Sequence, residues 1–166
     1  NAGPDQSICV GDSFDLSSIG SGTNRSYYKT QANANSASNP ISSTVTPGVT
    51  TTYFVRSDNA GCYNTDSVII NVNPILTPSV SISSSATSIC TGTNVTFTAT
   101  PTNWGTTPAY QWKLNGANVG SGGSTYSNAG LNNGDIISVE LTSNSACATQ
   151  PTATSSNTVI TVNALP

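Results

Sequence analysis

The chain has 166 residues, of which 35% are hydrophobic and only 7% are charged, and its formal net charge is −3. Four lysines and arginines cannot neutralise a run of phosphates, which argues against a nucleic-acid partner. No stretch approaches the ~18 apolar residues that cross a bilayer, which argues against membrane insertion.

The polar composition is unusual, because Ser, Thr and Asn supply 70 of the 166 residues. Low hydrophobicity often accompanies disorder, but disordered chains are also poor in β-branched and aromatic residues. Here Val, Ile, Thr and Tyr recur with a period of two, which is typical of half-buried strands. We therefore expect a folded all-β protein.

Alternating apolar residues predict the strands in chain order. In the first half they fall at Phe14 and Leu16, at Thr52–Val55, and at Val68, Ile70 and Val72. In the second half they fall at Val95, Phe97 and Ala99, at Tyr110, Trp112 and Leu114, at Ile136–Leu141, and at Thr158, Ile160 and Val162. Asn115-Gly116 is a type I′ hairpin signal, and Asn132–Asp135 predicts a second turn. No helical periodicity of useful length accompanies these strands.

The two halves of the chain resemble each other. Ser7–Gly11 returns as Ser88–Gly92, and Gly61-Cys62 returns as Ala146-Cys147. Self-similarity of this kind marks a tandem repeat. We expect two antiparallel β-sandwich domains of immunoglobulin type, residues 1–74 and 75–166. Between them, Pro74 and Pro78 predict a short and fairly stiff linker.

The four cysteines form one equivalent pair in each repeat. Sequence alone allows three connectivities, and the repeat favours Cys9–Cys62 and Cys90–Cys147. Such bridges lie outside the core strands, so we expect them at one end of each sandwich. Each would close a long loop and stabilise its domain by ~4 kcal/mol. Persistent disulfides also predict an oxidising, extracellular location.

The sequence is poor in catalytic and metal-binding groups. It has no histidine and no Cys-x-x-Cys pattern, so we expect no metal, no cofactor and no enzymatic activity. A glycosidase pair made of Asp135 and Glu140 is conceivable, but a turn residue and a solvated strand residue are the better interpretation. Carboxylates that could gather around Ca²⁺ lack EF-hand spacing and fit turn and edge roles better: Asp12, Asp15, Asp58 and Asp66.

Aromatic residues give the only hint of ligand recognition. A flat platform that stacks on sugars could be built from Tyr27, Tyr28, Trp104 and Tyr126. The alternative, which we favour, is that Trp112 and one of Tyr27 or Tyr28 fill the cores while Trp104 covers a loop.

Several segments resemble a known group of domains. Ala2–Cys9 with Gly11, Thr50–Val55, Gly61-Cys62 and Tyr110–Gly116 are similar to immunoglobulin-like or PKD-like repeats of secreted Bacteroidota proteins. The resemblance implies export, often by the type IX route, within adhesins or polysaccharide-degrading enzymes. In this group Asp66-Ser67-Val68 fits a short pattern for O-glycan attachment, with Ser67 as the acceptor. The first repeat has Tyr27-Tyr28 where the group often has Trp.

These observations favour a non-catalytic stalk module of a bacterial cell-surface adhesin or filament. Its partners would be neighbouring repeats of the same polypeptide, together with surface glycans or other cell-surface proteins. The alternative is a carbohydrate-binding module attached to a secreted polysaccharide-degrading enzyme.

Overall fold

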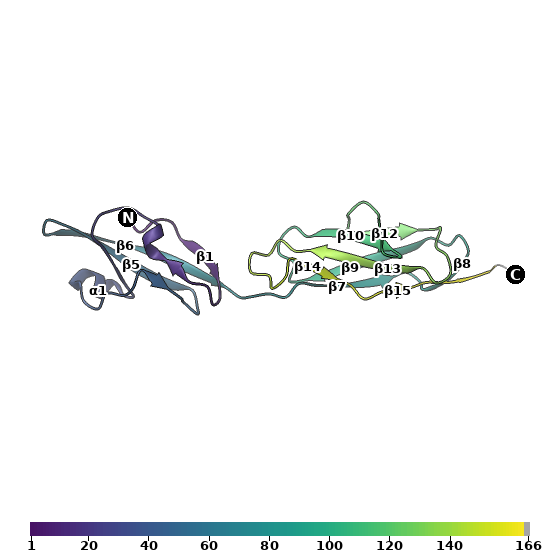
Figure 1. Ribbon diagram of the computed structural model, residues 1–166, viewed down its shortest axis with the longest axis horizontal. Coiled ribbons are helices and arrows are strands. Elements are labelled where there is room, and N and C mark those ends of the chain that lie inside the picture. Colours follow the sequence, from purple (N-terminus) through teal and green to yellow (C-terminus); the bar gives the residue numbers. More distant parts are fainter. Residues whose placement is uncertain (165–166) are drawn as a thin grey trace. The chain divides into compact units, whose positions relative to one another are not determined.

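The computed structural model describes residues 1–164, which fold into two compact units (Figure 1). Unit 1 comprises Asn1–Ile75, and unit 2 begins at Leu76. The elements of unit 1 are β1 (Gln6–Cys9), β2 (Phe14–Asp15), the 3-10 helix η1 (Leu16–Ser18), β3 (Arg25–Tyr28), α1 (Gln31–Ser36), β4 (Thr44–Val45), β5 (Thr51–Asn59) and β6 (Cys62–Asn73).

Unit 1 has a main sheet with the strand order β1-β6-β5-β3 and a short pair formed by β2 and β4. The long hairpin of β5 and β6 is antiparallel, whereas β1 runs parallel to β6. Alternate residues of β5 and β6 are buried, as expected for strands with one face on a core. That core contains Ala2, Leu16, Tyr27, Val45, Tyr53, Val55, Val68 and Ile70.

The short helix α1 was not predicted, because its sequence Gln-Ala-Asn-Ala-Asn-Ser has no apolar face at helical spacing. Its ends explain why it forms. The Thr30 side chain accepts a hydrogen bond from the Asn33 backbone N–H, and Ala37 ends the helix in the left-handed region with φ 53°. The helix contacts β3 and β5. Its one buried residue is Ala34.

Unit 2 is built from ten strands within its described residues. They are β7 (Ser79–Ser84), β8 (Ser88–Cys90), β9 (Val95–Thr102), β10 (Ala109–Leu114), β11 (Ala117–Val119), β12 (Thr125–Asn128), β13 (Ile136–Thr142), β14 (Thr152–Thr154), β15 (Thr158–Val159) and β16 (Thr161–Asn163). One sheet has the order β11-β10-β13-β14 with β15 also on β13, a second has the order β12-β9-β7, and β16 pairs with β8 in parallel.

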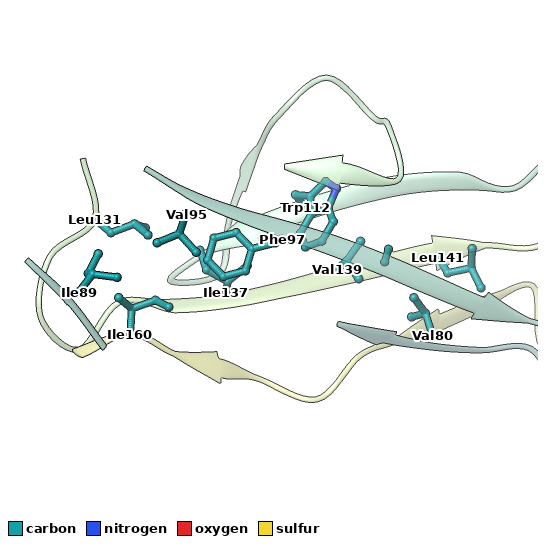
Figure 2. Packing of buried hydrophobic residues seen from close by; sticks show 11 residues of the cluster. Val80, Ile89, Val95, Phe97, Trp112, Leu131, Ile137, Val139, Leu141 and Ile160 are labelled. Carbon is teal, nitrogen blue, oxygen red and sulfur yellow. The ribbon is translucent and has the colours of Figure 1, made fainter. Parts of the chain in front are cut away.

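The core of unit 2 lies between these sheets (Figure 2). Trp112 of β10 is fully buried, and its indole N–H donates to the carbonyl oxygen of Gly123 at 2.9 Å. Its ring lies 6.3 Å from that of Phe97 and 5.9 Å from that of Tyr126, measured between centroids. Aromatic rings at these separations attract each other beyond the effect of burial alone. The aromatic group therefore anchors β9, β10 and β12 to one another.

Turn chemistry fixes the register in both units. Asn115 and Gly116 adopt φ 51° and 83°, the left-handed values that a type I′ turn requires between β10 and β11. Ala60 and Gly61 do the same between β5 and β6, with φ 48° and 87°. The second of these turns is the less expected one, because alanine rarely adopts a positive φ.

Both units are nearly all-β, and their sheets resemble those of immunoglobulin domains. In each, an early strand runs parallel to the last strand, while the central strands pair antiparallel. Unit 2 also has the buried tryptophan on a central strand that is typical of this fold. The expectation of one disulfide inside each domain is wrong, as the cysteine positions explain.

Candidate functional site

Cys9 ends strand β1 at the edge of the main sheet of unit 1. It lies opposite Asn73 in the parallel ladder with β6, and the next N–H, that of Val10, donates to the Asn73 carbonyl oxygen at 2.9 Å. The Cys9 N–H in turn donates to the Asp12 carboxylate at 3.1 Å. Cys9 is disulfide-bonded. A bonded cysteine therefore sits beside the last residue of the last strand of unit 1.

Cys62 lies at the end of β6 that is opposite to Asn73. It is the first residue of β6, faces Asn59 across the hairpin turn, and is an exposed free thiol. Strand β6 runs from Cys62 to Asn73, and at about 3.3 Å per residue this separates its ends by about 36 Å. Bonded cysteines have Cα atoms only about 5.5 Å apart. The predicted Cys9–Cys62 bridge is therefore wrong.

The cysteines of unit 2 are also at opposite ends. Cys90 ends β8 opposite Asn163 of β16, and it is an exposed free thiol. Cys147 follows the far end of β13, is buried and is disulfide-bonded. Its carbonyl oxygen accepts a 2.9 Å hydrogen bond from the N–H of Leu76, the first residue of the unit.

The length of β13 explains why the predicted Cys90–Cys147 bridge is wrong too. Ile136, the first residue of β13, pairs with Val159, which comes just before the last strand β16, and Cys90 lies opposite Asn163 of that strand. Cys147 instead comes after the other end of β13, at Thr142.

The sequence did contain a signal for the position of Cys62, namely the hairpin turn at Ala60-Gly61. Counting strand residues from that turn places Cys62 at the far end of β6 from Asn73.

We call the two ends of each unit its N-terminal pole and its C-terminal pole. The N-terminal pole holds the first residue of the unit, and the C-terminal pole holds the end of its last strand. Leu76 and Cys147 define the N-terminal pole of unit 2, while Cys9 and Cys90 each lie at a C-terminal pole. In unit 1 a shallow hollow is lined by both Asn1 and Cys62, so Cys62 marks its N-terminal pole.

The aromatic residues of the sugar-binding hypothesis are used mainly inside the units. Tyr27 is buried in the core of unit 1. Tyr28, on the other face of β3, is only 2% exposed. Tyr126 stacks on Phe97 and Trp112, and Trp104 packs against the same core while remaining partly exposed. Neither unit presents these rings as an exposed flat face.

The carboxylates of unit 1 make local structural bonds. Asp58 forms an ion pair with Arg56 at 2.7 Å, and this hydrogen bond lowers the pKa of Asp58. Asp15 accepts from the Ser17 backbone N–H at 2.9 Å, which lowers the pKa of Asp15. Over residues 1–164, no group of three or more His, Cys, Asp or Glu side chains is placed to hold a metal ion.

The two carboxylates of unit 2 lie in different settings. Asp135 is 7% exposed and accepts hydrogen bonds from the Asn115 side-chain amide and the Asn132 N–H, both at 2.8 Å. It therefore ties the β10–β11 turn to the turn before β13. Glu140 forms an ion pair with Lys113 across the paired strands at 2.8 Å.

Ser67, the expected O-glycan acceptor, is exposed on β6. Its N–H donates to the Asp66 side chain at 2.8 Å. A glycan on this hydroxyl would project from the strand into solvent. No helix among the described residues has the length and apolar character needed to traverse a membrane.

Comparison with known families gives one match. Residues 7–76 match the model of a family described as Flavobacterium inter-domain disulphide bond domain. The match covers nearly all of unit 1 and contains Cys9 and Cys62. No curated protein matches the chain by sequence.

Solved structures with similar folds are multidomain immunoglobulin proteins. The four N-terminal Ig domains of Dscam1 isoform 9.44 are 11% identical with a TM-score of 0.48, covering 98% of this chain and 44% of that one. The mouse nectin-like molecule 4 ectodomain is 16% identical with a TM-score of 0.40, covering 69% and 40%. Murine CEACAM1b is 13% identical with a TM-score of 0.44, covering 84% and 85%. The chain thus spans less than half of the first two.

Proposed function

We propose that this chain is a non-catalytic structural module of a bacterial cell-surface protein, in which a disulfide between Cys9 and Cys147 joins two immunoglobulin-like domains. The single observation that carries the proposal is the state of the four cysteines. Cys62 and Cys90 are free thiols, while Cys9 and Cys147 are each disulfide-bonded. The chain has four cysteines in all, which supports pairing the two bonded ones with each other.

The connection between the units supports this pairing. Cys9 lies opposite Asn73, and Cys147 accepts a hydrogen bond from Leu76. Three peptide steps separate Asn73 from Leu76, which reach about 11 Å at most. The linker therefore keeps both cysteines near the same short segment. The description of the matching family, which names an inter-domain disulfide, agrees with the pairing.

A bond across the linker acts as a second connection between the domains. One flexible connection leaves neighbouring domains free to swing, whereas two connections close together restrict that swing. Pro74 and Pro78 stiffen the first connection further. A stalk that presents a binding domain away from a cell surface needs such stiffness, and its disulfide needs an oxidising compartment outside the cytoplasm.

Small-angle X-ray scattering of the oxidised and reduced protein tests the proposal. We expect the oxidised protein to fit a narrow range of inter-domain arrangements and the reduced protein to fit a broader range. Cys147→Ser should reproduce the reduced behaviour, and Cys62→Ser, at an exposed free thiol, is the matched control that should not. Identical scattering for oxidised and reduced protein would contradict the stalk function.

A further inference from the structure

Unit 1 contains a second hollow, of about 490 Å³, which shares no lining residue with the one beside Cys62. It forms where one segment changes sheets. Ile41 bridges to Tyr27 of β3 in the main sheet, and its N–H donates to the Tyr27 carbonyl oxygen at 2.8 Å. Thr44 and Val45 then pair with β2 in the second sheet. The crossing segment leaves a hollow bounded by β4, the turn after it and the beginning of β5, with a volume usual for a small-ligand site.

The side chain of Tyr53, on β5, brings a polar group to the wall of this hollow. Only 3% of Tyr53 is exposed, and it belongs to the core of unit 1. Its hydroxyl makes no hydrogen bond with any described residue, yet every fully buried side-chain nitrogen or oxygen within residues 1–164 has a partner. The hydroxyl is therefore accessible, and the hollow gives it that access. Because burial raises the pKa of Tyr53 above its ordinary 10.0, the group stays protonated and can donate at neutral pH.

Lys29 is the only charged residue among those that line the hollow, and it directly follows β3. It is exposed, and within the described part of the chain it forms no ion pair and no side-chain hydrogen bond. The other three lysines and arginines are already engaged, namely Arg25 with the Ser17 and Ile19 carbonyl oxygens, Arg56 with Asp58, and Lys113 with Glu140. An unpaired ammonium in the lining favours a ligand with a negative charge.

The rest of the wall combines hydroxyl groups with apolar groups. The Thr44 and Thr46 hydroxyls make no hydrogen bond with any described residue, so each can both donate and accept. The apolar part consists of Ile41, Val45 and Pro47, of which the last two are buried. A sugar ring has the matching features, because its hydroxyls lie around the rim and its C–H groups form apolar faces.

We propose that this hollow binds a hexuronic acid unit, that is, a sugar ring with one carboxylate. Lys29 would hold the carboxylate, while Tyr53 and Thr44 would bond the ring hydroxyls. The apolar ring face would rest on Pro47. One ammonium matches one carboxylate, whereas phosphate groups are usually held by several Arg, Lys or backbone N–H donors. The inference goes beyond the proposed function and does not depend on the Cys9–Cys147 bond, because every lining residue belongs to unit 1.

NMR titration of the ¹⁵N-labelled full chain tests the site. The probes are galacturonate and glucuronate, each compared with galactose and glucose, which lack the carboxylate, and with acetate, which lacks the ring. We expect a uronate to shift the amide signals of residues 41–48 and 51–53 in the millimolar range. Its Kd should be about tenfold lower than that of the neutral sugar, the gain from one charge-assisted hydrogen bond, and acetate should bind at least as weakly as the neutral sugar. Trigalacturonate distinguishes a polysaccharide ligand, which should bind several-fold more tightly, from a free sugar.

Two variants separate the charge from the hydroxyl. Lys29→Gln should raise the Kd for the uronate about tenfold and leave the neutral sugar unaffected. Its matched control is Lys113→Gln, which removes a cation from unit 2.

Tyr53→Phe should weaken uronate and neutral sugar alike by several-fold. It should leave the Tm of unit 1 unchanged, because the hydroxyl has no partner among the described residues. Its matched control is Tyr27→Phe, at a buried tyrosine of the same core that does not line the hollow.

Three results would each overturn the inference: no uronate-induced shifts at the hollow, equal affinity for uronate and neutral sugar, or wild-type uronate binding by Lys29→Gln. Acetate binding as tight as that of the uronate would overturn it too, because the ring would then add nothing. Failure here leaves the proposed stalk function intact. Conversely, identical scattering of oxidised and reduced protein would contradict that function and leave this site standing, since uronate binding should be the same with and without reductant.

Discussion

Cys9 lies directly opposite Asn73 in the parallel ladder of β1 and β6. Asn73 comes three residues before Leu76, which begins unit 2. This places a bonded cysteine at the end of unit 1 from which the chain leaves. Cys62, by contrast, is a full strand length away at the hairpin turn. The ladder between β1 and β6 therefore decides which cysteine is available at the connection.

The first prediction concerns connectivity. Non-reducing peptide mapping of monomeric protein should recover Cys9 linked to Cys147, because these are the bonded cysteines. Alkylation without prior reduction should label Cys62 and Cys90, both exposed thiols. A peptide that links Cys9 to Cys62 would contradict the structure.

The second prediction is that one bond stabilises both units. With unit 2 folded, Cys147 is held beside Leu76, so the bond ties residue 9 of an unfolded unit 1 close to residue 76. Closing a loop of about 67 residues stabilises the folded unit by ~4 kcal/mol in the chain-entropy model. The reverse argument applies to unit 2, because folded unit 1 holds Cys9 beside Asn73.

Calorimetry with and without reductant measures this effect. Reduction should lower the Tm of both units by roughly 15 °C or more, given the usual slope for domains of this size. Cys147→Ser, a change in unit 2, should lower the Tm of unit 1 as well. Cys90→Ser serves as the control and should leave both transitions unchanged, while an unaffected unit 1 in Cys147→Ser would argue against the shared bond.

The third prediction concerns the aromatic core of unit 2. Trp112→Ala should cost about 3–5 kcal/mol of unfolding free energy, because it leaves a cavity beside Phe97. Trp104→Ala should cost less, since Trp104 is only partly buried. Urea unfolding followed by far-UV circular dichroism gives both values. Equal losses for the two variants would contradict the assigned packing.

The fourth prediction concerns the buried carboxylate between two turns. Asp135→Ala removes the acceptor of the hydrogen bonds from Asn115 and Asn132, and it should lower the unfolding free energy by about 1.5–3 kcal/mol, the usual loss for hydrogen bonds to a carboxylate. Asp135→Asn keeps one acceptor oxygen and should lose less. Chemical denaturation measures both. A neutral Asp135→Ala variant would show that the turns do not depend on this side chain.

The fifth prediction concerns acid stability of unit 1. Asp66 accepts backbone hydrogen bonds from Ala2 at 2.9 Å and Ser67 at 2.8 Å, which lower its pKa below the ordinary 3.8. A lowered pKa in the folded state means that Asp66 stabilises unit 1 above pH ~4 and loses this contribution as the pH falls through the folded value. Because Asp66 is exposed, solvent screening keeps the effect small.

Thermal unfolding of unit 1 from pH 6 to pH 2 tests this dependence. Asp66→Asn cannot ionise, so its Tm should fall less steeply than that of the wild type below pH 4. The two should differ most at neutral pH, where the wild type is the more stable. Parallel curves would show that Asp66 does not contribute to acid sensitivity.

The sequence by itself determined the features that depend on neighbouring residues. Alternating apolar residues predicted the strands β5, β6, β9, β10 and β13, whereas Leu16, also expected in a strand, lies in the 3-10 helix η1. Asn115-Gly116 predicted a turn that the structure contains. Trp112 was correctly assigned to a core for the same reason, because its position on an alternating strand settles which face it occupies. Helix α1 escaped detection because its stability comes from capping by Thr30 and from tertiary contacts.

The cysteine pairing was decided only by the tertiary structure. The repeat correctly identified Cys9 with Cys90 and Cys62 with Cys147 as equivalent positions, but equivalence does not specify distance. Distance depends on the length of β6 and on the parallel pairing of β1 with its far end, a contact between residues more than sixty positions apart. No hairpin turn connects β1 to β6, so the register of this pair is set by the packing of the sheets and not by turn chemistry.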